Sequence, residues 1–223
     1  MLDPFGGDGN QIIAYEPIGD KEVYDFTVPA TSNYINCGSV HHNTVAGAFE
    51  TTCHAIGEYP DWWVGRRFEG PTDGWCAGDT NETTRNIIQM ALLGPFLDFG
   101  TGMIPHRCVI GEPTRRQGLA EAVDTIRVQH SSGGISQLGL KAYEAGRAKF
   151  QGTSKHYCWI DEEPPEDVYD EILLRLMTLD GLLMATFTPM KGLSAIALRY
   201  LPHLAPAEFE EDLHNMAPEP ETV

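Results

Sequence analysis

The strongest constraint on the fold is an alternation of short apolar segments with segments of helical periodicity. Residues 74–78, 156–160 and 182–187 are short and apolar, which favours buried strands. Residues 80–94 and 166–177 carry apolar side chains at helical spacing, which predicts two helices between these strands. Strands that alternate with helices form βαβ units, whose strands pair in parallel and whose helices cover both faces of the sheet. We therefore expect an α/β fold with a mostly parallel sheet and flanking helices.

Two further elements are expected in the same region. The segment 44–59 has small and apolar residues at helical spacing and stops before Pro60, which predicts a helix of about three turns. Residues 124–130 and 135–142 have strand character and flank Ser131-Ser132-Gly133-Gly134. Turn-forming residues between two such segments are typical of a β-hairpin.

The chain divides into three parts of different character. Residues 1–43 hold two β-rich segments, 21–28 and 34–40, which predict a small all-β piece. Residues 44–192 carry the alternation of strands and helices. Residues 193–223 lose that periodicity and become acidic, so we expect a tail or linker there.

The charge and the cysteines exclude several classes of protein. The formal net charge is -17, and a protein that coats nucleic acid by neutralising phosphates needs clustered Lys and Arg instead. The five cysteines include no C-x-x-C pair, which argues against a structural zinc site and favours free thiols in a reducing compartment. No apolar run approaches 18 residues, so no membrane partner is expected and the predicted location is cytoplasmic.

A pair of carboxylates at a predicted strand end is the sharpest chemical signal. Asp161 and Glu162 directly follow the apolar segment 156–160, and ligands of open α/β sheets bind at the carboxyl ends of the strands. This arrangement has the form of a Walker B element, in which the first acid holds the Mg²⁺ of a nucleotide and the second orients an attacking water. The alternative is an acidic helix start, because acidic residues also favour the N-terminus of a helix.

A Walker B element requires a Walker A motif, G-x-x-x-x-G-K-[ST], and this sequence contains none. However, Thr44 opens a predicted helix that begins T-V-A-G-A, as the helix after a phosphate-binding loop would begin. The β-rich segment that ends at His41-His42-Asn43 stands where the glycines and the lysine are expected.

Four motifs in order make residues 44–192 resemble the ATPase domain of phage terminase large subunits. They are TVAGAFETTCHAIGEYPDWWVGRRF, AGDTNETTR, GRAKFQGTSKHYCWIDEEPPEDVYDEILLRLMT and GLLMATFTPMKG. The resemblance implies a P-loop NTPase-like (ASCE) fold with ATP and Mg²⁺ as ligands. It also implies that Thr44 and Asp161 bind the metal, that Glu162 is the catalytic glutamate, and that Thr186 and Thr188 lie in the motif that couples hydrolysis to DNA movement.

The resemblance further implies partners and an arginine finger. Packaging motors work as homo-oligomeric rings in which an arginine of one subunit reaches the phosphate of its neighbour. Arg147 is the first candidate, and Arg115 and Arg116 are the next. The expected partners are duplex DNA, a portal protein and a small terminase subunit, which implies transient residence at the viral procapsid portal.

The nuclease domain that this family carries after the ATPase domain is not expected within these residues. The aromatic residues Trp62, Trp63 and Phe68, close to Arg66 and Arg67, could stack on adenine or DNA. Packing in the protein interior is the alternative for them.

Residues 20–43 resemble the C-terminal (HINT) segment of an intein in VYDFTVPATSNYI and in His42-Asn43 followed by Thr44. The resemblance implies that Asn43 cyclises and cleaves its bond to Thr44, that His42 assists by proton donation, and that Thr44 is an acyl acceptor. Ser32 stands where many inteins have histidine, and Cys37 and His41 also depart from the pattern. An upstream half of the intein and terminase is the implied partner.

Three functional hypotheses follow. The first is a splice partner that carries the ATPase domain of a DNA-packaging motor, active after ligation at Asn43/Thr44. The second is a splicing module with an inactive or truncated passenger, and the third is a helicase-like P-loop ATPase. The segments DWWVGRR and KFQG favour the packaging motor over the helicase.

Overall fold

The computed structural model describes residues 33–36, 39–187 and 194–200, with side chains from residue 44 onward. The strands are β1 (Asn33–Asn36), β2 (Ser39–His42), β3 (Asp73–Gly78), β4 (Thr114–Arg115), β5 (Val123–Gln129), β6 (Ile135–Ala142), β7 (Tyr157–Asp161) and β8 (Leu182–Thr186). The α-helices are α1 (Asn43–Ile56), α2 (Asn81–Thr83), α3 (Met90–Leu93), α4 (Glu166–Met177) and α5 (Ala195–Tyr200). A π-helix, η1 (Thr84–Gln89), joins α2 to α3, and short 3₁₀-helices cover His106–Cys108, Tyr143–Ala145 and Arg147–Phe150.

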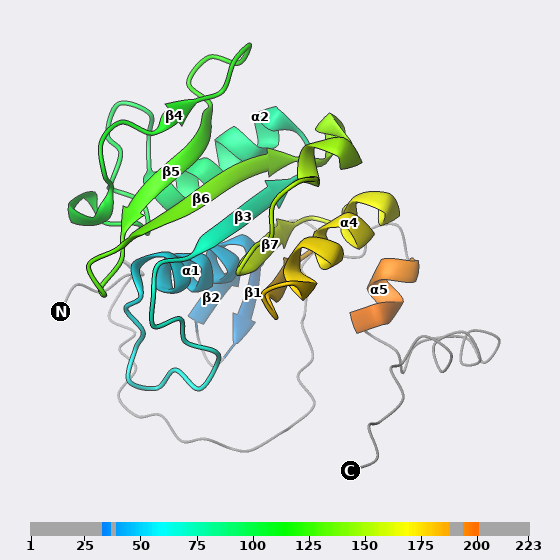
Figure 1. Cartoon of the computed structure of the whole chain (residues 1–223), viewed down its shortest axis with the longest axis horizontal. Helices are drawn as coiled ribbons and strands as arrows, with labels where there is room; N and C mark the ends of the chain where they lie inside the picture. Colours follow the sequence, from blue (N-terminus) through cyan, green and yellow to red (C-terminus); the bar gives the residue numbers. More distant parts are fainter. Residues whose placement is uncertain (1–32, 37–38, 188–193, 201–223) are drawn as a thin grey trace.

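Six strands form one mixed sheet in the order β4-β5-β6-β3-β7-β8 (Figure 1). The strands β6, β3, β7 and β8 run parallel to one another, whereas the pairs β4–β5 and β5–β6 are antiparallel. The expected α/β fold with a mostly parallel part and a β5–β6 hairpin is thus confirmed, and β4 is an addition that no sequence pattern indicated.

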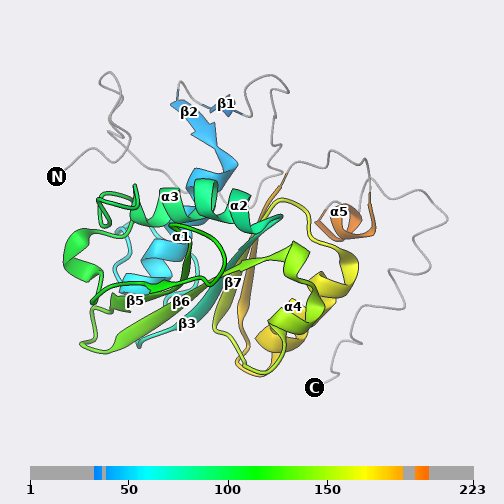
Figure 2. The ribbon, with the colours of Figure 1, turned by 90° about the horizontal axis from the view of Figure 1, so that it is seen from above.

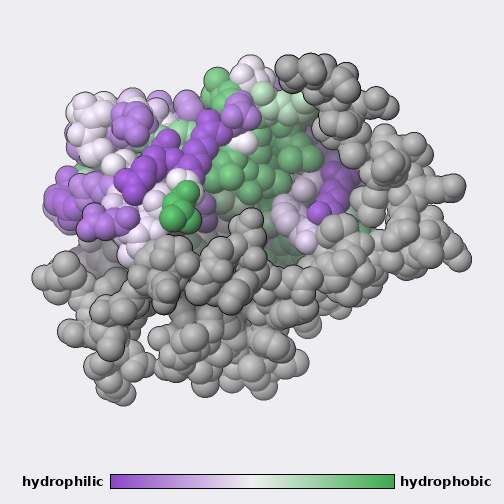
Figure 3. All heavy atoms as spheres, turned by 90° about the horizontal axis from the view of Figure 1, so that it is seen from below, coloured by the Kyte–Doolittle hydropathy of each residue, from purple (hydrophilic) through white to green (hydrophobic). Residues whose placement is uncertain are grey.

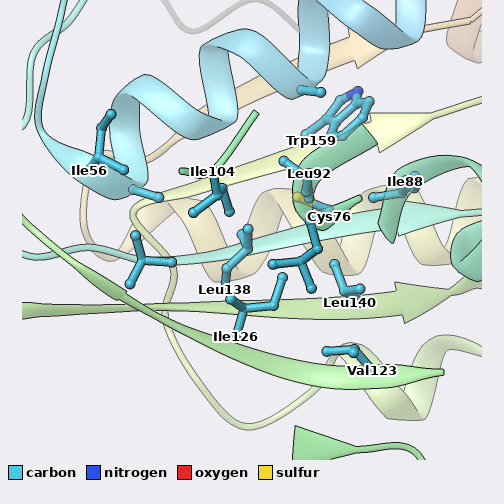
Figure 4. Packing of buried hydrophobic residues seen from close by; sticks show 14 of the residues in the cluster. Ile56, Cys76, Ile88, Leu92, Ile104, Val123, Ile126, Leu138, Leu140 and Trp159 are labelled. Carbon is cyan, nitrogen blue, oxygen red and sulfur yellow. The ribbon is translucent and has the colours of Figure 1, made fainter. Parts of the chain in front are cut away.

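Helices cover both faces of this sheet, as the view in Figure 2 shows. On one face, α1 and the run from α2 to α3 enclose a core that includes Ile88, Leu92 and Trp159 (Figure 4). On the other face, α4 and α5 contribute Ile172 and Ile196 to a second cluster. Both faces of the parallel strands are therefore buried, which explains why these strands are continuously apolar in sequence.

The helix α1 ends three residues before the predicted boundary at Tyr59. Gly57 has a φ of +70° and its amide donates to the carbonyl of Cys53 at 2.9 Å. Glycine adopts this left-handed conformation without a steric penalty and commonly terminates helices. The glycine, and not the later Pro60, is therefore the stop signal.

The sequence pattern predicted a regular helix over 80–94, but the observed helical run over 81–93 is irregular. Thr80 forms a capping box with Thr83 at its start, and the middle turn is the π-helix η1. The Thr84 hydroxyl at the start of this turn donates to the carbonyl of Lys141 in β6 at 3.1 Å. A contact with a distant strand therefore accompanies the irregular turn, and local periodicity could not reveal it.

The N-terminal β-piece differs from the expected single strand over 34–40. The structure has a two-stranded antiparallel hairpin, in which Asn33 pairs with His42 and Asn36 pairs with Ser39. Asn36 ends β1, and asparagine is a turn-forming residue type, which is a signal for this reversal. The other expected strand, 21–28, lies outside the described residues.

The last described helix, α5, lies in the segment 193–223 that was expected to be a tail or linker. Its residues Ile196, Ala197 and Leu198 are buried, so the packed core continues beyond residue 192. Within the residues that the structure describes, none of the helices has the length and hydrophobicity needed to span a bilayer.

Candidate nucleotide-binding site

The site lies at the carboxyl edge of the parallel strands. Asp161 is the last residue of β7, and it stands beside Thr186, the last residue of β8, in the parallel register. Parallel strands bring their carboxyl ends to the same edge of a sheet, which is where open α/β folds bind ligands. The predicted acid and one of the two predicted coupling threonines are therefore neighbours.

Thr44 joins them from the start of α1. Its hydroxyl lies 3.1 Å from Oδ1 and 3.4 Å from Oδ2 of Asp161, although 117 residues separate the two in sequence. The helix comes this close to β7 because Gly47 faces the indole of Trp159 across the interface, where even a methyl group would overlap the ring. Thr44 and Asp161 are thus brought together as the sequence predicted.

The indole of Trp159 determines how Thr186 binds Asp161. Trp159 donates from Nε1 to the Thr186 hydroxyl oxygen at 2.6 Å, and Thr186 Oγ1 lies 2.8 Å from Asp161 Oδ1. An indole nitrogen can only donate, so the threonine keeps its own proton for the carboxylate. Trp159 therefore fixes the direction of the hydrogen bond to Asp161.

Trp159 was not identified from the sequence, although one signal existed. Side chains two residues apart in a strand lie on the same face, so Trp159 and Asp161 had to share a face of β7. That face is the one that α1 covers.

Burial and neighbouring charges alter the acidity of both carboxyl groups. Burial raises the pKa of Asp161, and the hydrogen bonds from Thr186 and Thr44 counteract this by stabilising the ionised form. The pKa of Glu162 is also raised, first by partial desolvation and then by the negative charges of Asp161 and Asp79. Two carboxyl groups with different surroundings thus stand side by side, a feature common at functional sites.

The oxygen atoms at this edge suit a hard cation. A hydroxyl and a buried carboxylate about 3 Å apart are ligand types that Mg²⁺ uses in phosphate sites, where water and substrate complete the shell. Across the described part of the chain, no group of three or more His, Cys, Asp or Glu residues could hold a metal ion. Thr44 and Asp161 are the residues at this edge that could hold such a cation.

The three candidate arginines all have partners within the chain. Arg147 donates from Nε to Glu171 of α4 at 2.8 Å, and about half of its side chain is exposed. The guanidinium of Arg115 lies over the ring of Phe96. Arg116 bonds to Asp124 at 3.2 Å and also contacts Asn81 and the carbonyl of Leu140. Arg116 is the most enclosed of the three, while Arg115 and Arg147 are exposed.

Replacing Arg147 by alanine is expected to lower the free energy of unfolding at pH 7 by about 1 kcal/mol. The hydrogen bond from Arg147 is the main cause that holds the pKa of the buried Glu171 below its ordinary value of 4.5. A lowered carboxyl pKa stabilises the fold above the ordinary pKa and ceases to do so as the pH falls through the lowered value. The difference between variant and native protein should therefore shrink below about pH 4.5 in urea unfolding.

The matched control is Lys149→Ala, on the same 3₁₀-helix and exposed. Equal stability of the Arg147→Ala and native chains at pH 7 would contradict a structural role for the ion pair and leave the arginine free for a neighbouring subunit.

The aromatic residues of the 57–72 loop lie at the other edge of the sheet. Trp63 and Phe68 pack against His54, and Phe68 also contacts Tyr157, the first residue of β7. Asp161 is the last residue of β7, so the full length of this strand separates these rings from the carboxylate. The packing alternative fits Trp63 and Phe68, whereas Trp62 is 42% exposed. Figure 3 shows one face of the molecule, on which a hydrophobic area borders hydrophilic surface.

Several predicted residues fall outside the description. Thr188 lies beyond the described residues, as do the side chains of His42 and Asn43. The backbone places His42 at the end of β2 and Asn43 at the start of α1. The predicted splice junction therefore coincides with a change from strand to helix.

The comparisons with known proteins agree with the main resemblance. A family model described as "Terminase large subunit, T4likevirus-type, N-terminal" matches residues 43–212. The large terminase subunit of Salmonella phage P22 is 33% identical over 175 residues, an alignment that covers 70% of this chain and 35% of the phage protein. The chain thus spans well under half the length of that relative. No solved structure matches the chain.

Proposed function

Because the chain belongs to the phage terminase large subunit family, we propose that residues 44–192 form the ATP-hydrolysing domain of a viral DNA-packaging motor. The observation that carries the proposal is the convergence of Thr44, Asp161 and Thr186 at the carboxyl edge of the sheet. The bound metal would neutralise charge on the phosphate oxygens of ATP. Thr44 and Asp161 would hold it.

The remaining residues of the site position the nucleophile and respond to the nucleotide. Glu162 orients the attacking water and accepts a proton from it. The pKa of Glu162 is raised, so it lies closer to neutral pH than the pKa of an ordinary glutamate. Thr186 holds the Asp161 carboxylate in a fixed rotamer, and it also lies at the end of β8. A change in the state of Asp161 is therefore communicated to β8, the strand that resembles the coupling motif.

The first part of the phosphate loop is proposed to come from a segment ligated before Thr44. No G-x-x-x-x-G-K sequence precedes this threonine in the chain. Among the described residues, β8 is paired on one side only, and its sequence LLMAT has none of the charged or proline residues that protect an ordinary edge. A strand added beside β8 would end at the same sheet edge at which α1 begins.

The residues before Thr44 are proposed to be an intein segment that is removed in this ligation. The family match begins at residue 43, which supports a separate origin for the hairpin β1–β2. The side-chain amide nitrogen of Asn43 attacks the main-chain carbonyl carbon of the same residue, so the peptide bond to Thr44 breaks. The products are a C-terminal succinimide and the free amine of Thr44, and His42 donates the proton that the leaving amine requires.

The complete motor is proposed to act as a ring with a portal protein, a small terminase subunit and duplex DNA. The net charge of -17 restricts contacts with DNA to local patches, because the chain has too few Lys and Arg residues relative to Asp and Glu to form a broad basic surface. One subunit would supply an arginine to the site of the next. Arg147, whose side chain is about half exposed, is the first candidate for that arginine.

The proposal is tested by co-expressing the chain with an upstream terminase half in which Gly-Lys is followed by the N-terminal segment of the intein, the leaving group when the acyl group passes to Thr44. A ligated product, detected by mass spectrometry, is expected to hydrolyse ATP, while the unligated chain is expected to bind ATP with a Kd above about 1 μM. Submicromolar binding by the unligated chain would overturn the two-piece site. Cleavage at Asn43 without later ATP hydrolysis would favour a splicing module with an inactive passenger, and strand separation by the ligated product would favour a helicase.

A further inference from the structure

The backbone of Glu162 adopts a conformation that non-glycine residues rarely occupy. Its φ is +67°, in the left-handed region, and this conformation carries a cost of about 1 kcal/mol or more for a residue with a side chain. Such a conformation persists only where the surrounding contacts enforce it. Regular alternation along β7 would place the Glu162 side chain on the face of Cys158 and Ile160, which is buried in the second core cluster, and the turn takes the exposed Glu162 out of that alternation.

Two contacts hold this turn. The amide of Glu162 donates to the carbonyl of Thr186 at 3.0 Å. The hydroxyl of Tyr143 lies 3.2 Å from the carbonyl of Asp161 and 3.1 Å from the carbonyl of Glu162. These two carbonyls belong to the peptide groups on either side of the Glu162 Cα. A hydroxyl has one proton, so Tyr143 donates to one of these carbonyls at a time, and either hydrogen bond restrains one rotation about that atom.

Tyr143 is itself firmly placed. It opens the 3₁₀-helix that follows β6, is 2% exposed, and packs with Trp75 and Phe150 in the second core cluster. Its hydroxyl also lies 2.9 Å from the carbonyl of Ala77 in β3. Burial raises the pKa of this phenol well above its usual value, so it remains a donor at physiological pH.

The geometry points to Tyr143 as a positioning residue for Glu162, an inference that rests on the proposed role of Glu162 in ATP hydrolysis. One buried hydroxyl faces three backbone carbonyls at the ends of β3 and β7 and holds the left-handed turn from which the carboxylate projects. Phenylalanine at this position would preserve the packing of the ring and remove only the restraint. Glu162 would then sample other conformations, and the geometry that it offers to a water molecule would be lost for part of the time.

The test measures ATP hydrolysis by the ligated protein with Tyr143→Phe. The turnover number kcat is expected to fall about 10-fold while the KM for ATP changes less than about 2-fold, because misplacing a catalytic group affects the chemical step more than binding. In a Glu162→Gln background, the Tyr143→Phe change should have no further effect on kcat. The control is Tyr169→Phe, another buried tyrosine, whose hydroxyl bonds to Tyr200 on the far helices.

A second measurement uses the unligated chain. Hydrogen exchange of the Glu162 amide should be faster in Tyr143→Phe than in the native chain and unchanged in Tyr169→Phe. If Glu162→Gln abolishes turnover but Tyr143→Phe leaves both kcat and this exchange rate unaltered, the positioning inference is wrong and the proposed function stands. If Glu162→Gln itself leaves turnover intact, the proposed function fails first.

Discussion

Replacing Glu162 by glutamine is expected to lower the ATP turnover of the ligated protein at least about 100-fold. Glutamine keeps the size of the side chain but cannot accept a proton from water, so the loss should fall on kcat. ATP affinity should change little, because the residues proposed to hold the metal, Thr44 and Asp161, are untouched. The measurements are steady-state ATP hydrolysis and a binding titration.

The neighbouring acid provides the matched control. Glu163→Gln makes the same chemical change one residue later and is expected to leave kcat within about 2-fold of the native value, since Glu163 has no part in the proposed site. The native enzyme should also lose activity on acidification at a pH above 4.5, because the pKa of Glu162 is raised from that value. Full activity of Glu162→Gln, or an equal loss in Glu163→Gln, would show that another group activates the water.

The part of the site that sequence patterns could predict is the part that depends on strand periodicity. The apolar run before Asp161 ends in acids, and parallel strands deliver such ends to one edge of a sheet. The resemblance to a known family added Thr44, which the structure brings within 3.1 Å of that acid. The first inference needs only the local pattern and the general geometry of α/β folds, whereas the second also needed the resemblance.

The residues that sequence patterns missed act through contacts that only the folded chain creates. A tryptophan in an apolar strand is ordinarily core, and nothing local indicates that the nitrogen of Trp159 meets Thr186, 27 residues later. The same holds for Tyr143, whose hydroxyl reaches carbonyls of two other strands. The π-helix η1 also involves a contact that exists only in the folded chain, because its Thr84 donates to a carbonyl of β6. A single sequence shows the periodicity of strands and helices, but it does not show which polar side chains pair across the sheet.

Gly47→Ala is expected to destabilise the chain by about 1 to 3 kcal/mol, even though alanine favours a helix by up to about 1 kcal/mol over glycine. A Cβ at this position would lie 2.2 Å from Nε1 and 2.3 Å from Cε2 of Trp159. The indole is fully buried and bonded to Thr186, so it cannot move aside without breaking that bond. The helix α1 must therefore shift instead. The measurement is urea unfolding of the unligated chain.

The control for this substitution is Gly70→Ala, where a Cβ meets no atom within 4 Å and the expected change is below about 0.5 kcal/mol. Adding Trp159→Phe to Gly47→Ala should cost less than the sum of the two single changes, because the phenyl ring lacks the nitrogen that the new methyl group overlaps. A shift of α1 also carries Thr44 away from Asp161, so this one glycine links the packing of the helix to the geometry of the metal ligands. If Gly47→Ala is as stable as the native chain, α1 tolerates displacement, and the close approach of Thr44 to Asp161 does not depend on the glycine.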